Sequence, residues 1–505
     1  MEIKKKNTDQ AKVVTLNLPH IVLRFIIVPK LKNSPLVINV KDHNLCEIKI
    51  TREKILEDIE QNALYGFISD HILLADNVNE LKVLLLKSIV RESLYSLYRE
   101  YKAMLFEMLI KPSFLIAEHY IRKGNIFFMI KDHYRCLARE ALQRIIDSPL
   151  LNNVLDELEK EGLIERRGSF IKPSIRLKGE FEEKKTKYMS PLITTLKNVS
   201  SFTLLSSAFS IINLLARIAF KVDRSQLPSI NEDSSILVET DKGLKPLNPE
   251  EELKGIFGRK IVLKKLGGMI NTAYLLIQED GTRRVIKLFN EWTNLKWLPL
   301  AFWALGAYTF DPTGKGRLIN EYTMNRQFKR MGLKVPSIYS IDLNRKIIVE
   351  EYINGKTLKD IIVEILNKNY KPIYLEYIRQ ALSKISFIHS RNYVLGDANP
   401  SNILIHDRSN EVYFIDLEQS REGDKFAWDL STIMFFLAHY MQGFSFDNLD
   451  SIVNSMIEGY LEHGSIKDIE DALRIPYLRV YAFFAYPHAI YKVYRTVSKC
   501  LRSFK

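Results

Sequence analysis

The sequence predicts an α+β protein with a helix-rich N-terminal half and a two-lobed C-terminal half. Three patterns carry this prediction. Apolar residues recur at helical spacing through 76–145, strand-like runs flank a glycine pair near residue 267, and short apolar strands alternate with polar loops over 393–416. The chain has 505 residues and is 46% apolar. It is therefore long enough for roughly two to four domains with buried cores.

Composition shifts divide the chain into five expected segments. These are a mixed α/β region (1–75), a helical region with a winged-helix-like part (76–180), an amphipathic helical segment (181–223), a polar, proline-containing linker (224–257) and a two-lobed domain with a basic, aromatic tail (258–505). The three cysteines follow no metal or disulfide spacing, and the N-terminus lacks the apolar core of a signal peptide. We therefore expect a cytoplasmic protein.

The N-terminal half predicts strands first and helices later. The run Phe25–Val28 suggests a strand, whereas Pro149 and Gly162 mark the start and end of a helix. A short hairpin follows and turns near Gly168, in the order of a winged helix. The predicted helix is acidic, whereas DNA binding needs Lys and Arg against phosphates. We therefore expect protein contact here and no DNA partner.

The segment Phe202–Phe220 needs separate attention because it is 19 residues long and largely apolar. Polar residues recur in it every three or four positions, which is typical of an amphipathic helix. This pattern favours a packed or partner-binding helix. A helix lying on a membrane surface and a true membrane span remain as alternatives.

The C-terminal half begins with elements that could hold a phosphate. Gly267 and Gly268 lie between two apolar runs and predict a glycine-bearing hairpin, in which backbone amides can approach an anion. Lys287 lies inside the next apolar strand, where an ammonium group needs a partner. Glu321 lies on the apolar face of a predicted helix that Gly332 ends. We expect Lys287 and Glu321 to pair.

The most informative stretch runs from Tyr393 to Asp416. Asp397 is followed five residues later by Asn402, and a predicted hairpin then brings Asp416 back to Asn402. Carboxylate and amide oxygens are ligands that Mg²⁺ accepts, and phosphoryl transfer depends mainly on positioning and charge neutralisation. Together these residues predict a phosphoryl-transfer site, although each alone would be ordinary turn chemistry.

Several motifs in this half carry a family resemblance. They are Val285–Lys287, Asn320–Glu321, Gly332–Pro336, Val349–Gly355, Ile388–Asp397, Asn402–Leu404, Phe414–Asp416 and Trp428–Leu430. On these motifs, residues from about 258 to 445 resemble the protein-kinase-like superfamily. They are most similar to its compact atypical branch, which includes the RIO kinases and the small kinase of the KEOPS tRNA-modification complex. Lipopolysaccharide and aminoglycoside kinases are more distantly similar.

The resemblance implies an ATP- and Mg²⁺-dependent site. Asp397 would be the catalytic base, and Asn402 and Asp416 would hold Mg²⁺. Lys287, oriented by Glu321, would hold the nucleotide phosphates.

Further roles follow from the same resemblance. Gly267 and Gly268 would cover the nucleotide, and the backbone near Glu350 and Tyr352 would bind its base. Asp429 would brace the backbone of the catalytic loop.

The chain also departs from the family pattern. Leu395 stands where a His or Tyr is usual, and Leu417–Glu418 stands where Phe-Gly usually follows the metal-binding Asp. Glu418 could add a carboxylate near the metal or weaken ATP binding. Only 12 residues separate Asp416 from Asp429, so no long activation segment or peptide-docking platform is expected.

Two further stretches have open interpretations. Trp297–Phe310 is an apolar insert that could be a cap on the small lobe, a docking element or plain core. Arg474–Lys505 interleaves basic and aromatic residues in a chain of net charge +13. This tail could contact RNA or a ribonucleoprotein, or its aromatics could pack on the large lobe.

We therefore expect an ATP-dependent phosphotransferase, an atypical serine/threonine protein kinase that could also phosphorylate itself or act as an ATPase. One alternative is a kinase for a sugar, lipid or antibiotic hydroxyl. The other is a nucleotide-binding pseudokinase scaffold in an RNA-linked complex.

Overall fold

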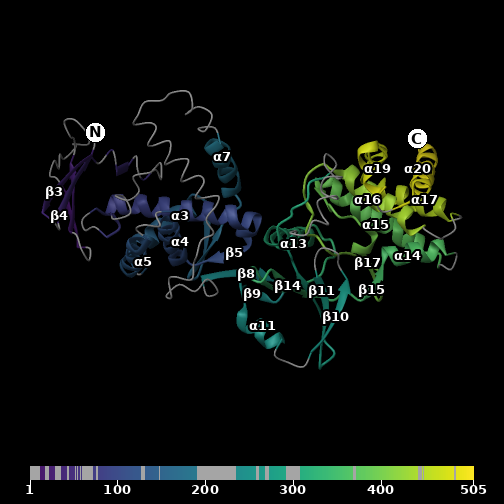
Figure 1. The fold of residues 1–505 in the computed structure, drawn as a ribbon, viewed down its shortest axis with the longest axis horizontal. Coiled ribbons are helices and arrows are strands. Elements are labelled where there is room, and N and C mark those ends of the chain that lie inside the picture. The colour runs from purple at the N-terminus through teal and green to yellow at the C-terminus, as the bar shows by residue number, and fades with distance from the viewer. Residues whose placement is uncertain are drawn as a thin grey trace. The chain divides into compact units, whose positions relative to one another are not determined.

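The computed structural model describes residues 12–17, 22–28, 36–42, 45–51, 53, 55–56, 59, 72–74, 78–126, 131–146, 148–189, 235–257, 261–267, 272–291, 308–367, 371–441, 446, 448–482 and 485–504. The chain divides into two compact units, Met1–Val238 and Glu239–Lys505 (Figure 1). Phe202–Phe220 and Gly268 lie outside the described residues, so the structure does not test what was expected of them. Within the described part, every helix is too short or too polar to cross a bilayer.

The first unit begins with a four-stranded sheet. Its strands are β1 (Lys12–Asn17), β2 (Val22–Val28), β3 (Leu36–Asp42) and β4 (Leu45–Thr51). Their spatial order is β1-β2-β4-β3, and only the central pair, β2 with β4, is parallel. The strand predicted at Phe25–Val28 is part of β2, whose β-branched residues suit a sheet.

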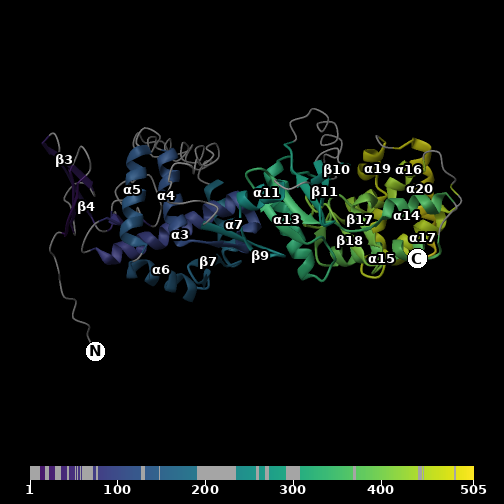
Figure 2. The same ribbon diagram turned by 90° about the horizontal axis from the view of Figure 1, so that it is seen from below.

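Helices form most of the rest of this unit. They are α3 (Asn79–Tyr101), α4 (Pro112–Ile126), α5 (Lys131–Ile145), α6 (Pro149–Lys160) and α7 (Leu177–Met189). Leu81, Leu85 and Ile89 of α3 are buried, as the apolar repeat in 76–145 predicted, whereas Leu84 of the same repeat is exposed. α3 runs through the middle of these helices (Figure 2).

The predicted acidic helix and hairpin are present as α6, β6 (Ile164–Arg167) and β7 (Phe170–Pro173), with Gly168 in the left-handed conformation at the turn. β7 pairs with β5 (Met108–Ile110), which in turn pairs with the start of β8 (Ile236–Thr240). The acidic side chains of α6 have cationic neighbours. Glu157 and Glu161 contact Lys87 at 3.3 and 2.5 Å. That these elements act as a winged helix stays a prediction.

The linker predicted at 224–257 is wrong for its described part. Residues 235–257 form β8, β9 (Gly243–Pro246) and α11 (Glu250–Phe257), and the second unit begins at Glu239 instead of 258. Leu253 and Ile256 of α11 are buried against Leu276 and Ile286 of the neighbouring sheet. The segment is mostly polar and contains prolines, so its few apolar residues did not predict these contacts.

The second unit has a small lobe built on a five-stranded sheet in the order β10-β11-β12-β14-β13. The strands are β10 (Ile261–Gly267), β11 (Thr272–Gln278), β12 (Arg283–Leu288), β13 (Ile338–Asp342) and β14 (Ile347–Glu351), and all neighbours are antiparallel. Helix α13 (Gly314–Arg330) accompanies this sheet. The side chain of Thr313 caps α13 by accepting a hydrogen bond from the Gly316 amide, and Gly332 follows its end at a φ of +80°.

The large lobe is mainly helical. Its helices are α14 (Leu358–Leu366), α15 (Ile373–Ser390), α16 (Phe426–Tyr440), α17 (Leu449–Tyr460), α18 (Ile466–Ala472), α19 (Ile475–Tyr481) and α20 (Pro487–Arg502). They gather apart from the small-lobe strands (Figures 1 and 2). Two small sheets lie beside them: β15 (Gly355–Thr357), β17 (Ile403–His406) and β18 (Val412–Phe414), and the pair β16 (Tyr393–Val394) with β19 (Arg421–Glu422). One buried cluster joins these helices with strands β16, β17 and β18.

Candidate functional site

The centre of the site is an ion pair between the sheet and helix of the small lobe. Lys287 is in the middle strand β12, where it lies opposite Ile348 of β14. Its Nζ lies 2.7 Å from Oε1 of Glu321 on α13, as the sequence predicted. Both side chains are buried, with 8% and 1% of their surface exposed. Because burial removes the hydration of both charges, loss of either partner would leave the other as an uncompensated buried charge.

Two more carboxylates surround the same ammonium group. Glu350 of β14 places Oε1 3.2 Å from Lys287 Nζ, and Asp416 places Oδ1 3.9 Å away. Burial raises the pKa of Glu321 to about 8 and also raises the pKa of Glu350. Burial alone would lower the pKa of Lys287, but the three nearby carboxylates outweigh it and raise that pKa well above its usual range.

The nucleotide-binding predictions differ in how they fit the structure. Gly267 ends β10 next to a register shift against β11, and Tyr352 is half-buried beneath the Arg283 guanidinium. Glu350 was expected to contribute through its backbone, but its backbone pairs with neighbouring strands and its side chain points to Lys287. The nucleotide contacts of these residues stay predictions.

The catalytic loop brings the predicted polar residues together. Strands β17 and β18 form the expected hairpin. At the end of this hairpin, the Ile415 amide donates a hydrogen bond to the Asn402 carbonyl oxygen at 2.9 Å. Asn402 Nδ2 donates to Oδ2 of Asp397 at 3.0 Å. Asp416 follows the hairpin in the left-handed region, with a φ of +61°. The three residues therefore lie at one end of one hairpin.

The oxygens at this end suit a hard cation. Asn402 uses its amide nitrogen on Asp397, which leaves the amide oxygen for a ligand. Asp416 Oδ1 is buried and accepts no hydrogen bond from any described residue. One amide and one carboxylate oxygen are a suitable protein contribution for Mg²⁺, which usually keeps several waters.

Asp397 has the electrostatic character of a general base. Burial, reinforced by the charge of Asp416, raises the pKa of Asp397 to about 7, although the Asn402 hydrogen bond opposes the change. A base is most effective when its pKa lies near the working pH.

Asp429 at the start of α16 fixes the backbone that leads to Asp397. Its carboxylate accepts from the amides of Leu395 at 2.6 Å and Gly396 at 2.8 Å, and lies 3.1 Å from His389 Nε2. Gly396 has a φ of +73°, and a side chain there would collide with the Gln419 carbonyl oxygen. The bracing contact expected of Asp429 is present.

Sequence reasoning missed the partner of Glu418. Arg317 of α13 is fully buried, and its Nη1 lies 3.0 and 3.1 Å from the two carboxylate oxygens of Glu418. The sequence suggested that Glu418 could add a carboxylate near the metal or weaken ATP binding. Neither role predicted an ion pair with a residue of α13. Arg317 was visible only as one basic residue at the start of a predicted helix, and its sequence distance of 101 residues from Glu418 gave no local signal.

The same segment has further anchors. Asn320 Nδ2 donates to the carbonyl oxygens of Glu418 and Ser420, and the Tyr308 hydroxyl donates to the Gln419 carbonyl oxygen at 2.5 Å. Tyr308 also stacks on Trp428 of α16 with ring centroids 5.4 Å apart. The described end of the apolar insert Trp297–Phe310 is therefore core packing, and residues 297–307 lie outside the described residues.

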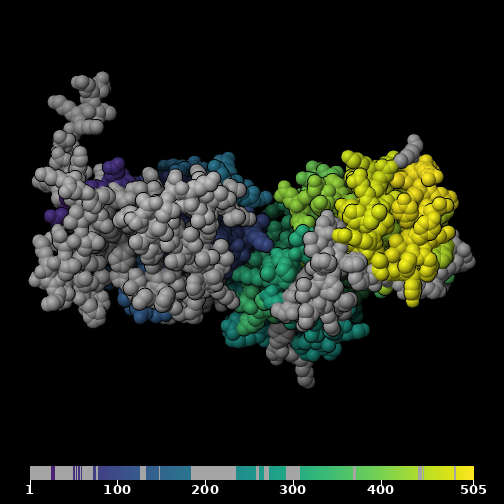
Figure 3. All heavy atoms as spheres, turned by 45° about the horizontal axis from the view of Figure 1, so that its top comes forward, coloured from purple at the N-terminus to yellow at the C-terminus, as the bar shows by residue number. Residues whose placement is uncertain are grey.

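The C-terminal tail forms α19 and α20. The aliphatic face of α20, including Val493 and Val497, is buried, but Tyr486 and Tyr491 are 58% and 61% exposed. The alternative in which the tail packs its aromatics on the large lobe is therefore confirmed for Tyr481, which is buried in the large-lobe core, and wrong for Tyr486 and Tyr491. The C-terminal helices form a continuous surface (yellow in Figure 3).

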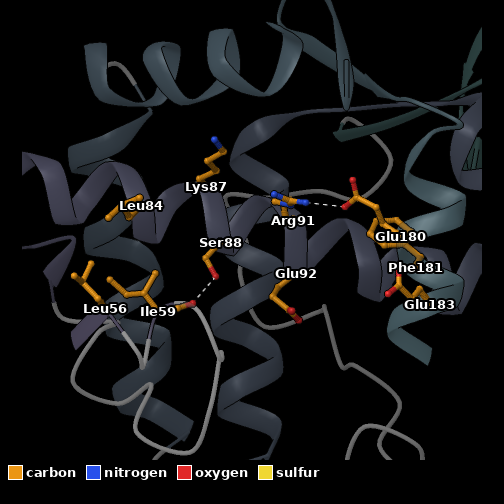
Figure 4. A pocket seen from close by; sticks show the side chains of 10 residues that line it. All are labelled: Leu56, Ile59, Leu84, Lys87, Ser88, Arg91, Glu92, Glu180, Phe181 and Glu183. Carbon is orange, nitrogen blue, oxygen red and sulfur yellow. Dashed lines mark hydrogen bonds and ion pairs between the residues drawn. The ribbon is translucent and has the colours of Figure 1, made fainter. Parts of the chain in front are cut away.

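A separate hollow of about 450 Å³ lies in the first unit (Figure 4). Helices α3 and α7 supply most of its lining. Arg91 pairs there with Glu180 at 2.7 Å, and the Ser88 hydroxyl donates to the Ile59 carbonyl oxygen. The hollow contains none of the predicted site residues.

Known proteins similar to this chain match parts of it. No family model matches the sequence. A segment of 101 residues is 32% identical to the EKC/KEOPS complex subunit bud32 of Dictyostelium discoideum, covering 20% of this chain and 40% of that protein. The KEOPS complex subunit Bud32 of Pyrococcus abyssi is 36% identical over 102 residues, covering 20% and 44%. The chain thus spans less than half the length of these relatives.

Two other comparisons add context. A probable bifunctional tRNA threonylcarbamoyladenosine biosynthesis protein of Methanobrevibacter smithii is 30% identical over 155 residues, covering 30% of this chain and 26% of that protein. The Rio2 kinase of Chaetomium thermophilum, solved as an ADP/Mg²⁺-phosphoaspartate complex, overlaps 76% of this chain and 96% of its own at 12% identity, with a TM-score of 0.28.

The buried Lys287–Glu321 pair, the loop around Asp397 and the sequence matches are those of an atypical protein-kinase-like fold. Within that class, a segment of this chain is similar in sequence to part of the Bud32 subunits of KEOPS complexes.

Proposed function

We propose that this protein is an ATP- and Mg²⁺-dependent phosphotransferase, an atypical serine/threonine protein kinase. The observation that carries the proposal is the hairpin that joins Asp397, Asn402 and Asp416 beside the buried Lys287–Glu321 pair. Phosphoryl transfer needs this combination of a base, hard ligands and a fixed cation.

Each residue has a role that follows from its contacts. Lys287 holds the phosphates, and Glu321 keeps its ammonium group in place from α13. Asp397, oriented by Asn402, accepts the proton of the attacking hydroxyl. Mg²⁺, held by Asn402 and Asp416, would neutralise charge on the phosphates.

A protein hydroxyl is the proposed acceptor, because the relatives are subunits of protein complexes. A small-molecule hydroxyl is the main alternative, since only 12 residues follow Asp416 before Asp429 and leave no peptide platform. A nucleotide-binding scaffold is the alternative without catalysis. Retention of both the base and the two metal ligands favours an enzyme.

The test uses purified full-length protein and ATP labelled on the γ-phosphate. Wild type should transfer label to itself or to a generic protein acceptor, and Asp397→Asn should lose at least a hundredfold in rate because the base is gone. Glu252→Gln, which removes a carboxylate of α11 that pairs with Lys245 and not with Lys287, is the matched control. A wild type that binds Mg-ATP but labels neither protein nor small alcohols nor water would establish the scaffold instead.

We also propose that α20 contacts single-stranded RNA. Lys492, Arg495 and Arg502 lie on one exposed face of α20 together with Lys499, which pairs with Asp450 of α17 at 2.7 Å. This basic face is about 15 Å long at the rise of an α-helix. Tyr491 lies beside it and is exposed, which offers a base a stacking surface. No acidic residue occurs from 486 to 505.

Surface substitutions test this better than deletion, because α20 buries Val493 and Val497 in the large-lobe core. Replacing Arg495 and Arg502 by Ala should weaken binding of a single-stranded RNA oligonucleotide. It should also reduce the dependence of log affinity on log salt by about 1.4, since each lost phosphate contact removes about 0.7. A salt dependence equal to that of wild type would remove α20 as the RNA surface.

A further inference from the structure

Glu350 adds a further carboxyl group beside Lys287, the lysine proposed to hold the nucleotide phosphates. Three carboxyl groups, from Glu321, Glu350 and Asp416, lie within 3.9 Å of one ammonium group. One of them, Glu321, already orients Lys287 from α13 at 2.7 Å. Asp416 belongs to the proposed metal site, where a cation would neutralise it. Glu350 therefore has neither role, yet its side chain is only 3% exposed.

The second oxygen of Glu350 makes this position unusual. Oε1 contacts Lys287 at 3.2 Å, but the buried Oε2 accepts no hydrogen bond within the described part of the chain. A buried carboxylate with an unmet oxygen costs free energy, so a purely structural position would favour an apolar residue. The side chain leaves the strand β14 just before the segment that joins the two lobes.

The three N–H bonds of an ammonium group limit what Lys287 can do. Glu321 takes one of these directions and Glu350 is placed to take a second. A phosphate that approaches Lys287 must therefore share the ammonium group with Glu350 and, wherever the pH is high enough to ionise Glu350, also approach its negative charge. At these distances two like charges repel strongly where water is scarce.

We propose that Glu350 is an internal competitor of the nucleotide phosphates for Lys287, so that a nucleotide binds well only together with a divalent cation. This inference rests on the proposed function and names how its nucleotide site is controlled. A divalent cation at Asp416 and Asn402 offsets the excess carboxylate charge, whereas a metal-free nucleotide adds to it. Glu350 is thus a positioning residue that acts through Lys287.

The test measures nucleotide affinity directly, by calorimetry or by a fluorescent ATP analogue, with EDTA and with Mg²⁺ at one pH. Glu350→Gln keeps the shape of the side chain and removes its charge. In EDTA we expect this variant to bind ATP at least tenfold more tightly than wild type. With Mg²⁺ the gain should be smaller, about threefold or less, because the cation already offsets the charge. A damaged fold would weaken binding, so tighter binding cannot come from misfolding.

Two further proteins complete the design. Glu350→Leu should also bind ATP more tightly than wild type in EDTA. It replaces Glu350→Gln in the test if the Gln variant folds poorly. Glu252→Gln removes a carboxylate from the same lobe, where Glu252 pairs with Lys245 at 2.9 Å, and should bind as wild type does.

The outcomes separate this inference from the proposed function. If wild type binds Mg-ATP but the Glu350 variants bind ATP no more tightly in EDTA, the competition is overturned and the nucleotide site stands. If neither wild type nor variants bind ATP under any condition, the proposed function fails and the competition fails with it. An equal gain with and without Mg²⁺ would also contradict the role of the cation.

Discussion

The buried Arg317–Glu418 pair offers the sharpest test of the structure. Replacing Arg317 by Met removes the guanidinium that contacts both oxygens of the Glu418 carboxylate, which is 4% exposed. Removing one partner of a buried pair typically costs about 3–5 kcal/mol. For a unit of this size, each kcal/mol lowers the melting temperature by about 2–4 °C. We therefore expect a fall of about 6–20 °C in Tm for this unit.

The double variant, Arg317→Met with Glu418→Met, distinguishes a buried pair from simple packing. Replacing both charges by apolar groups of similar size is often close to neutral. Some cost remains, because Arg317 Nη2 also donates to the Asn290 carbonyl oxygen. We expect the double variant to be more stable than either single variant.

Thermal and urea unfolding, followed by circular dichroism, measure the stability of wild type, of the two single variants and of the double variant. Because the chain has two units, the transition of the second unit must be assigned first, for example by its shift with Mg-ATP. A matched surface control is Lys254→Gln, which breaks a pair with Glu251 on the exposed side of α11 and should leave Tm unchanged. If the losses of the two single variants simply add in the double variant, the buried pair is not coupled and the reasoning is refuted.

Two further predictions follow from the same geometry. Asp397→Asn should stabilise the metal-free protein at pH 8 but not at pH 4. Burial raises the pKa of Asp397 to about 7, so the folded state prefers the protonated carboxyl group. The wild-type protein therefore loses folding stability as the pH rises from about 4 to 7. If Asp397→Asn raised the stability equally at pH 4 and pH 8 in EDTA, this reasoning would be contradicted. Thr313→Ala removes the side-chain cap of α13, which accepts from the Gly316 amide at 3.2 Å, and should cost about 1 kcal/mol in urea unfolding. Thr313→Ser should restore most of it.

Local sequence patterns were sufficient for the elements that carry the site. The strand with Lys287, the helix with Glu321 and the hairpin from Asn402 to Asp416 follow from apolar periodicity, glycines and turn residues. Their pairing could also be predicted, because a buried charge needs a partner and few were available. The elements themselves depend on neighbours within one element or on adjacent strands, whereas the Lys287–Glu321 pairing spans 34 residues and followed from the cost of burying a charge.

Contacts between distant segments could not be predicted. Glu350 looked like part of a strand entering the interlobe segment, and only the register of β12 against β14 shows that its side chain reaches Lys287. Arg317 and Glu418 were both visible as charges, but their pairing depends on how α13 packs on the segment after Asp416. Likewise, residues 235–257 contain too few apolar positions to predict β8, β9 and α11 from composition.

The Arg317–Glu418 pair also bears on how the site can be regulated. Asn320 and Arg317 of α13 hold the segment immediately after Asp416, and Glu321 on the same helix holds Lys287. A displacement of α13 would therefore break the Lys287–Glu321 pair and expose a buried arginine–carboxylate pair at once. Because those losses add to several kcal/mol, movement of α13 is a costly switch for this domain. Control through the charge around Lys287 needs no such movement. Glu350 and a divalent cation can change nucleotide affinity while the helix, the loop and the braced backbone stay in place.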